Sequence, residues 1–161
     1  MPVQHPVLAI DHGEARLGLA VTDPLGLAAL PMETIDARRS DPVTRISQIV
    51  REREVRRILL GLPLRRDGTE GSAAARVRAF GASISNALPD VPLEYADERL
   101  STATASEKLR HAGKPAKRQR NLIDQVAALE ILNDWLAEHP APGQPEIHNP
   151  PQKGKTHPGH P

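Results

Sequence analysis

The sequence predicts an α/β fold in which a mixed five-stranded sheet carries helices on both faces. Two observations predict it: three short β-like stretches joined by tight turns come first, and helical and β-like patterns alternate after them. Hairpin-linked strands followed by alternating helices and strands are typical of mixed sheets. At 161 residues the chain is long enough for one domain with a real core and too short to suggest two.

The first three strands are predicted from apolar runs and turn residues. Residues 7–10 form a continuous apolar run that ends at Asp11, as expected of a strand buried on both faces. A second run, 17–22, follows a glycine-containing turn, and a third β-like stretch covers 27–35 after the turn signals Asp23-Pro24 and Gly26. Short turns between these stretches predict an antiparallel meander.

Helices and strands then alternate along the chain. Ser40-Asp41-Pro42 predicts a capped helix start with proline at the first helical position, followed by apolar residues at helical spacing. Residues 55–60 predict a strand ending at Gly61, and 91–96 predict another. Further helices are predicted over 69–87, 101–111 and 121–138. The apolar stripe predicted for the last helix consists of Leu122, Val126, Leu129, Leu132 and Leu136, with Ile131 and Trp135 beside it.

Composition excludes several classes of protein. With one Trp, one Tyr and one Phe, the core must be mainly aliphatic, and nucleic-acid modules that stack bases on aromatic platforms are disfavoured. The absence of cysteine excludes disulfides, zinc-thiolate sites and thiol nucleophiles. The first residues lack a basic signal region, and no apolar run approaches the roughly 20 residues that span a bilayer. We therefore expect a cytoplasmic protein without a membrane partner.

The chain divides at residue 138. Residues 1–138 are predicted to form the folded domain, whereas 139–161 are rich in proline, glycine and histidine and contain one aliphatic residue larger than alanine, Ile147. Such a segment buries too little apolar surface to offset its ordering entropy, so it is predicted to be a disordered tail.

Three acidic residues far apart in the sequence are predicted to face one cleft. Asp11 closes an apolar strand, Glu98 closes another, and Asp124 opens a helix. A few carboxylates are what a hard divalent cation such as Mg²⁺ prefers, since it keeps several waters. The pattern predicts a metal-dependent enzyme that processes phosphates. A plain dipole-matching role at the helix start is the commoner explanation for a residue such as Asp124.

Two glycine-containing motifs supply candidate phosphate ligands. In DHGEARLG (11–18), Gly13 permits close backbone approach, and Arg16 is predicted to hold a phosphate beside the metal; a simple hairpin turn is the alternative. In GLPLRRDGTEG (61–71), Arg65 and Arg66 add positive charge, and Thr69 is predicted to cap the next helix. An ordinary exposed connection with solvated arginines explains this loop equally well.

Two further segments concern the acids and a basic strap. In ADERLST (96–102), Asp97 and Glu98 are adjacent, so strand alternation sends one of them into the cleft while Arg99 pairs with the other; a salt-bridged strand end is the alternative. Residues 108–120 carry several basic residues and no acid, which predicts a flexible strap for a polyanion. Its candidate phosphate ligands are Lys114, Lys117, Arg118 and Arg120.

Together, in this order, the four motifs resemble the YqgF/RuvX family of pre-16S rRNA nucleases, once called Holliday junction resolvase-like proteins. The resemblance spans about residues 6–138, and the order of elements matches a ribonuclease H-like fold. It implies that Asp11, Glu98 and Asp124 are metal-binding carboxylates for Mg²⁺ or Mn²⁺. His12 stands where relatives are expected to have an apolar or aromatic residue, and it is predicted not to bind metal.

The resemblance implies hydrolysis of phosphodiester bonds at the 5′ end of pre-16S rRNA, on RNA or ribosomal precursor particles, by a monomer or homodimer. A four-way DNA junction is a second nucleic-acid substrate. A non-catalytic RNA-binding factor in ribosome assembly or transcription is a rival that needs no metal. An ATP-binding phosphotransferase is a further rival, but at this length we expect the second half-domain that such enzymes close over nucleotide to be missing.

Overall fold

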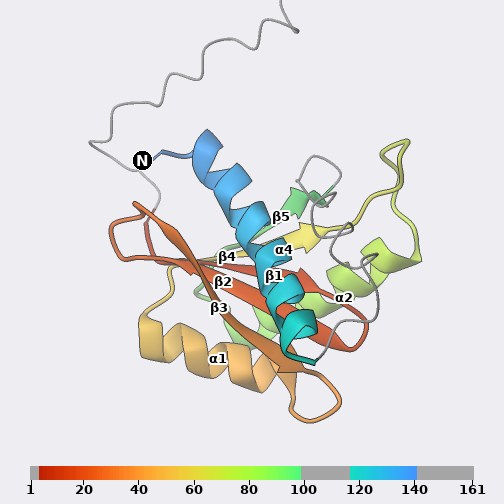
Figure 1. Cartoon of the computed structure of the whole chain (residues 1–161), viewed down its shortest axis with the longest axis horizontal. Coiled ribbons are helices and arrows are strands. Elements are labelled where there is room, and N and C mark those ends of the chain that lie inside the picture. Colours follow the sequence, from red (N-terminus) through yellow and green to blue (C-terminus); the bar gives the residue numbers. More distant parts are fainter. Residues whose placement is uncertain (1–3, 99–116, 141–161) are drawn as a thin grey trace, which may run out of the picture.

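The computed structural model describes residues 4–98 and 117–140, which form a twisted sheet between helices (Figure 1). The elements are β1 (Val7–His12), β2 (Arg16–Thr22), β3 (Ala29–Asp36), α1 (Pro42–Arg53), β4 (Arg57–Leu62), α2 (Ser72–Ala87), β5 (Leu93–Asp97) and α4 (Lys117–Glu138). The sheet has the strand order β3-β2-β1-β4-β5. The predicted mixed five-stranded sheet is confirmed.

The predicted meander is present at the start of the chain. β1 pairs antiparallel with β2, and β2 with β3. The turn between β2 and β3 is closed by Asp23, whose side chain accepts a hydrogen bond from the Leu27 amide at 2.9 Å, and by Gly26 at a φ of 71°. Glycine adopts a positive φ without the steric penalty that a Cβ brings, so this turn suits its sequence.

Parallel pairing completes the sheet. β4 lies parallel to β1 on one side and to β5 on the other. The strand predicted to end at Gly61 continues through this glycine to Leu62, so Gly61 lies inside β4 and pairs with Ala96 of β5. A glycine inside a strand often marks a site where another group approaches the backbone closely.

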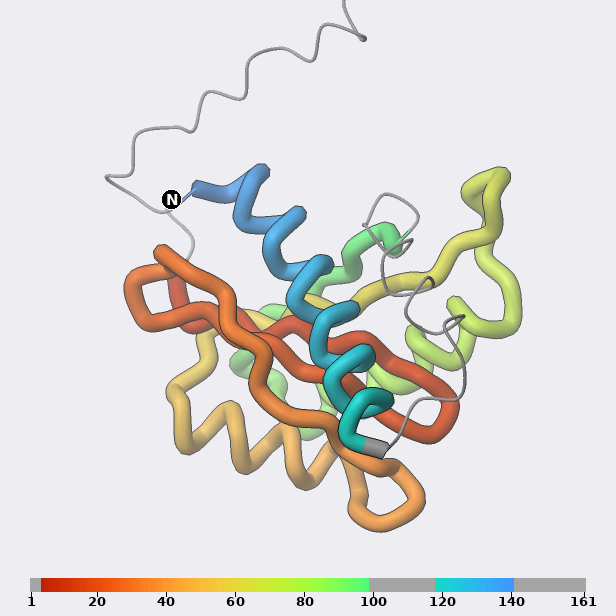
Figure 2. Tube along the Cα trace, in the orientation of Figure 1, coloured from red at the N-terminus to blue at the C-terminus, as the bar shows by residue number. Residues whose placement is uncertain are grey.

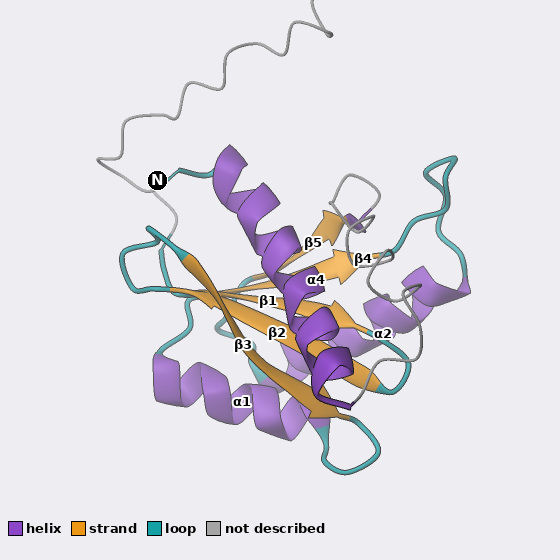
Figure 3. Cartoon of the chain, in the orientation of Figure 1, coloured by secondary structure: helices purple, strands orange, loops and turns teal. Residues whose placement is uncertain are grey.

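Helices cover the two faces unequally (Figure 3). The larger core lies under α1 and α2 and includes Leu8, Ile10, Ile49, Val77 and Ile84. The smaller core lies under α4 and consists of Val7, Ala9, Ala20, Leu59, Ala128, Ile131, Leu132 and Trp135. The cores are mainly aliphatic, as expected, and Trp135 is the aromatic exception at 5% exposure.

Helix α1 begins as its sequence predicts, and α2 does not. Asp41 caps α1 by accepting a hydrogen bond from the Thr44 amide at 3.1 Å, and Pro42 follows it. The start predicted for the next helix at Thr69 is wrong: α2 begins at Ser72, with Gly71 as its N-cap. The Thr69 hydroxyl donates instead to Asp67 at 2.6 Å, within a loop in which Leu64 pairs with Glu70. Local side-chain bonds of this kind compete with helix formation.

Helix α4 starts earlier and is rotated relative to the prediction. It begins at Lys117 rather than residue 121. The predicted stripe is partly wrong, since Leu122 is 54% exposed, and the buried residues are Ile123, Asp124, Ala128, Ile131, Leu132 and Trp135. The physical reason is close packing, because the face with the small Ala128 is the one that approaches the sheet. The predicted helix over 101–111 lies outside the described residues.

The C-terminal end of α4 is fixed to the start of the chain. His139, the first residue of the predicted tail, stacks on Trp135 with ring centroids 4.2 Å apart. His5 meets the same indole edge-on and forms a 2.8 Å hydrogen bond with Thr22. Residues 141–161 lie outside the described part of the chain. No helix within that part is long and apolar enough to cross a membrane.

We predict that stability falls as the pH drops below about 6.5, the ordinary pKa of histidine. Burial lowers the pKa of His5 in the folded protein, although Asp23 opposes part of this effect. The unfolded chain therefore binds more protons between the native and ordinary pKa, and stability is lost as the pH falls through that window. Urea unfolding at several pH values checks this. His5→Gln should flatten the dependence, while His12, whose pKa is also lowered mainly by burial, retains its share.

An unchanged pH dependence in His5→Gln would show that His5 is equally protonated in both states.

Candidate active site on the α4 face of the sheet

Strand alternation places Asp11 on the face covered by α4. Val7 and Ala9 lie in the core under α4, whereas Leu8 and Ile10 lie in the core on the opposite face. Asp11 is two residues beyond Ala9, so its side chain points to the α4 side. His12 points the other way and packs against Phe80 with ring centroids 4.6 Å apart. His12 therefore lies on the face opposite Asp11.

Two glycines flank Asp11 on this face. Gly18 of β2 pairs directly with Asp11, and Gly61 follows Leu60, the β4 partner of Ile10. Helix α4 fills the space above Gly18 so closely that a Cβ at this position would collide with the carbonyl oxygen of Asp124. The absence of side chains at these two positions brings other elements down to the strand that carries Asp11.

Glu98 occupies the space above the second glycine. A Cβ at Gly61 would lie 2.9 Å from Oε1 of Glu98 and 2.7 Å from Cδ1 of Ile131 in α4. Asp97 ends β5 two residues after Tyr95, which packs against the opposite core. The two adjacent acids therefore face opposite sides of the sheet, as alternation predicted. Glu98 is the one on the Asp11 side, as the family resemblance implied.

Asp124 reaches the same face from α4. It is 7% exposed, and its Oδ2 accepts a 2.8 Å hydrogen bond from Nε of Arg16. The prediction that it opens a helix is wrong: it lies about two turns inside α4, beyond the first turn where the helix dipole acts. A buried carboxylate needs a charged partner, and Arg16 supplies one. Dipole matching therefore does not explain this residue.

The structure thus brings the three predicted acids to one face, with Asp11 between the glycines that seat Asp124 and Glu98. They do not form a closed cluster: within residues 4–98 and 117–140, no group of three acidic or histidine side chains is arranged to hold a metal ion. The donor set itself consists of carboxylate oxygens, which are the ligands that Mg²⁺ and Mn²⁺ prefer.

The predicted phosphate ligands are distributed over several places. Arg16 touches Asp124 directly. Arg65 is exposed on the loop between β4 and α2, which projects from the sheet (Figure 2), and its guanidinium lies against Gly71. Arg118 and Arg120 are exposed on the first turns of α4, so this end of the predicted strap is helical. Arg99 and Lys114 lie outside the described residues, and of Lys117 only the helical backbone is described.

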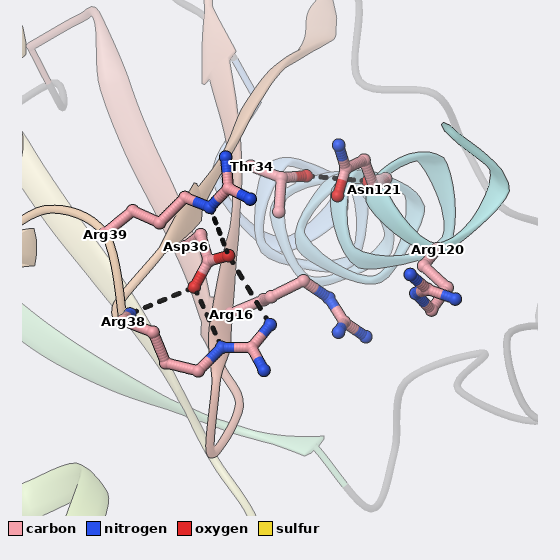
Figure 4. A pocket seen from close by; sticks show the side chains of 7 residues that line it. All are labelled: Arg16, Thr34, Asp36, Arg38, Arg39, Arg120 and Asn121. Carbon is pink, nitrogen blue, oxygen red and sulfur yellow. Dashed lines mark hydrogen bonds and ion pairs between the residues drawn. The ribbon is translucent and has the colours of Figure 1, made fainter. Parts of the chain in front are cut away.

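Two arginines that the sequence reading missed stand beside Arg16. Arg38 and Arg39 line a hollow of about 190 Å³ together with Arg16, Arg120, Asp36, Thr34 and Asn121 (Figure 4). Their signal in the sequence is weak, because it consists only of a basic pair in the turn that follows β3. Only the pairing of Arg16 with Asp36 across β2 and β3 shows that this pair ends beside the first motif.

The strand order, with α1 and α2 on one face and α4 on the other, defines a ribonuclease H-like fold. The solved structure of RuvC from T. thermophilus in complex with a Holliday junction substrate superimposes with a TM-score of 0.50 at 15% identity, covering 82% of this chain and 94% of that one. At this identity the likeness concerns the fold alone.

The family follows from sequence comparison. The family model described as "RuvX: Holliday junction resolvase" matches residues 5–138, and the chain belongs to this family. A relative from Nocardia farcinica is 41% identical over 141 residues, covering 83% of this chain and 78% of the relative. One from Streptomyces avermitilis is 41% identical over 138 residues, covering 85% and 88%. Both carry the name "Putative pre-16S rRNA nuclease".

We predict that Gly18→Ala lowers the free energy of unfolding by about 1–3 kcal/mol, as overpacking does. The added methyl group would meet the backbone of Asp124 and Gln125, which cannot rotate away as a side chain can. Equilibrium denaturation in urea measures the loss.

Gly71→Ala is the matched control. Its methyl group would meet only the exposed Arg65 guanidinium, at 2.9 Å and beyond, and this side chain is able to move. Alanine is a poorer N-cap than glycine, which destabilises the protein, but it also reduces the conformational entropy of the unfolded chain, which stabilises it. The two effects roughly cancel, so the free energy of unfolding should change by less than about 1 kcal/mol. Equal stability of the two variants would contradict the close seating of α4 on β2.

Proposed function

We propose that this chain is a metal-dependent nuclease whose Asp11, Glu98 and Asp124 carry the hydrolysis of phosphodiester bonds. The observation that supports it is the placement of these three residues on one face of the sheet: Asp11 pairs with Gly18, the Asp124 backbone lies over Gly18, and the Glu98 carboxylate lies over Gly61. Membership of the RuvX family supports the nuclease class. The domain that carries the activity is proposed to span residues 1–138.

The residues on this face suit a hard divalent cation. Asp11, Glu98 and Asp124 would hold one or two Mg²⁺ or Mn²⁺ ions, which activate water and stabilise charge on the scissile phosphate when bound. Asp11 lies in β1, Glu98 directly follows β5 and Asp124 lies in α4, so three separate elements would together hold the cation.

The protein's own contribution is to orient these groups. Arg16 holds Oδ2 of Asp124 at 2.8 Å and thereby fixes the direction of this carboxylate in a nearly buried position. The Arg16 side chain is itself 30% exposed and lines a hollow, so a phosphate oxygen could approach it from the solvent side. Arginine suits this dual role because its planar fork presents several donors at once.

Pre-16S rRNA is the proposed substrate, processed at its 5′ end in the cytoplasm. Its support is the name carried by the relatives at about 41% identity. A DNA four-way junction is the second candidate, favoured by the description of the matching family. Both substrates present phosphodiesters to the same face, so the acidic site serves either.

We predict that Asp11→Asn abolishes cleavage without unfolding the domain, because a strand-end carboxylate that serves a cation contributes little to stability. Gel assays of a labelled pre-16S rRNA fragment and of a synthetic DNA junction, each with Mg²⁺ or Mn²⁺, measure the activity. Thermal melting of the variant should match that of the wild type. Cleavage by Asp11→Asn at the wild-type rate, or binding without cleavage by the wild type, would contradict the proposal.

The adjacent acids provide a matched pair of variants. Glu98→Gln should lower the cleavage rate by a factor of about 10² or more, because it removes a group that acts directly at the reacting centre. Asp97→Asn changes the same charge on the opposite face and should retain most of the activity. The reverse order of rates would place the reaction on the α1 and α2 side of the sheet.

A further inference from the structure

The hollow beside the acidic face is rich in guanidinium groups. Arg16, Arg38, Arg39 and Arg120 line it, and we call these four residues the arginine pocket. Its volume of about 190 Å³ is below the roughly 300–1,000 Å³ of sites that enclose a small organic molecule. A phosphate group held from one side is the better match in size and charge.

Three elements fix the shape of this pocket. Arg16 begins β2 directly opposite Asp36, which ends β3, and Arg38 and Arg39 follow in the next turn. Arg120 comes from the first turn of α4. This turn is tied to β3, because the Thr34 hydroxyl donates to the carbonyl oxygen of Asn121 at 2.7 Å. Figure 4 shows Arg16 and Arg120 extending toward a common space, with Arg38 and Arg39 on either side of Asp36.

The positive charge of the pocket exceeds its negative charge. Asp36 is the one acidic residue among the described residues that line it, and Asp124 pairs with Arg16 beside it. Hydrogen bonds from Arg38 keep the pKa of Asp36 below its ordinary value, and Arg39 adds to this effect. Among the described residues that line the hollow, four guanidinium groups stand beside the single carboxylate of Asp36, and a lining of this composition favours an anion.

The ion pairs within the pocket are weak enough to rearrange. Nε of Arg38 lies 3.2 Å from Asp36, and Nε of Arg39 lies 3.8 Å away. The two arginine side chains are 70% and 75% exposed. Exposed pairs of this kind contribute about 0–1 kcal/mol, so both guanidinium groups are able to turn toward a phosphate at little cost.

Arg16 joins the pocket to the acidic face. The same guanidinium that lines the hollow also binds Asp124. A second, shallower hollow of about 580 Å³ continues from Asn121 along α4 and is lined by Arg118, Leu122 and Gln125. The positive surface thus extends from the acids across the end of β3 and along the first turns of α4.

We infer that the arginine pocket is a second phosphate site, which binds the sugar–phosphate backbone of a nucleic-acid substrate on the β3 side of the acidic face. This inference rests on the proposed function for the identity of the anion. Its consequence is directional: the bound strand runs from Asp11 past Arg16 to the β3 end of the sheet.

The test compares Arg38→Gln/Arg39→Gln with Arg51→Gln/Arg53→Gln. The control pair is exposed at the end of α1, on the opposite face, and removes the same charge. Fluorescence anisotropy with a labelled single-stranded RNA, in Ca²⁺ to suppress cleavage, gives affinity at several salt concentrations. The slope of log affinity against log salt is negative, and each arginine–phosphate interaction that is removed should reduce its magnitude by about 0.7. The pocket variant, which loses two arginines, should therefore show a slope smaller in magnitude by about 1.4.

Parallel salt plots for wild type, pocket variant and control would overturn the inference. So would an equal decrease in both variants, which would indicate attraction by net charge alone. A labelled DNA junction in the same titration, with about 0.9 expected per phosphate, reports whether the pocket serves both kinds of backbone. Melting curves of both variants verify the fold.

Asp36→Asn provides an independent readout of opposite sign. Removing the carboxylate that competes for Arg38 and Arg39 should tighten RNA binding, whereas the amide oxygen still accepts the bond from the Arg38 amide. Weaker or unchanged binding would contradict the inference.

The failure of the pocket and the failure of the nuclease proposal can be told apart. If the wild type cleaves RNA but its salt plot is parallel to that of the pocket variant, the arginine pocket is refuted and the nuclease proposal stands. If binding depends on the pocket but the wild type cleaves nothing, the nuclease proposal is refuted and the pocket stands.

Discussion

The close contact between α4 and β2 at Gly18 is the constraint on which the rest of the site depends. Because Gly18 has no side chain, the carbonyl oxygen of Asp124 lies where a Cβ would otherwise be. This contact sets the height and rotation of α4 above the sheet. It brings the Asp124 side chain to Arg16, and it places the first turn of α4 where Asn121 meets Thr34.

This packing buries the carboxylate of Asp124, which costs free energy. Asp124 is nearly buried, and a buried carboxylate is unfavourable unless charged or hydrogen-bonding groups surround it. Arg16 offsets the cost while remaining partly exposed. The same arginine thus stabilises the helix on the sheet, orients a predicted metal ligand and lines the arginine pocket. Replacing it would disturb all three roles at once, which is why tests of the pocket use Arg38 and Arg39.

The two faces of the sheet divide stability and chemistry between them. The face under α1 and α2 carries the larger aliphatic core, with Leu8, Ile10 and Leu60 fully buried. The α4 face carries a smaller core. On this face the strands have no side chain at Gly18 and Gly61, and groups from α4 and Glu98 occupy that space. Asp11 lies at the edge of this smaller core, so substitutions of it should affect function more than folding, whereas the buried Asp124 contributes to both.

Much of this arrangement is readable from the sequence because it depends on local rules. Alternation predicts that Asp97 and Glu98 face opposite sides of the sheet, although the choice of Glu98 comes from the family resemblance. Turn residues predict the meander and the start of α1 at Asp41. The errors arise where tertiary contacts decide. Thr69 has the chemistry of a cap, but the bridge between Leu64 and Glu70 keeps its loop extended.

Helix α4 and the arginine pocket illustrate a second limit. The predicted stripe contains Leu122, yet the face with Ala128, Ile131 and Leu132 is the buried one. The rotation of α4 is set by the approach of the Asp124 backbone to Gly18, which the leucine spacing does not report. Arg38 and Arg39 lie beside Arg16 and Arg120 because of the register of β2 and β3 and the contact of Asn121 with Thr34. No pattern within one segment contains that information.

The most direct test of the central claim is where a divalent cation binds. Titration of the isotopically labelled protein with Mn²⁺, followed by paramagnetic broadening of backbone amide signals, locates the ion without reference to catalysis. We expect saturable broadening centred on Asp11, Gly18 and Gly61, weaker in Asp11→Asn, with the amides of α1 unaffected. Broadening centred elsewhere, or equal broadening in wild type and Asp11→Asn, would contradict the proposed metal site.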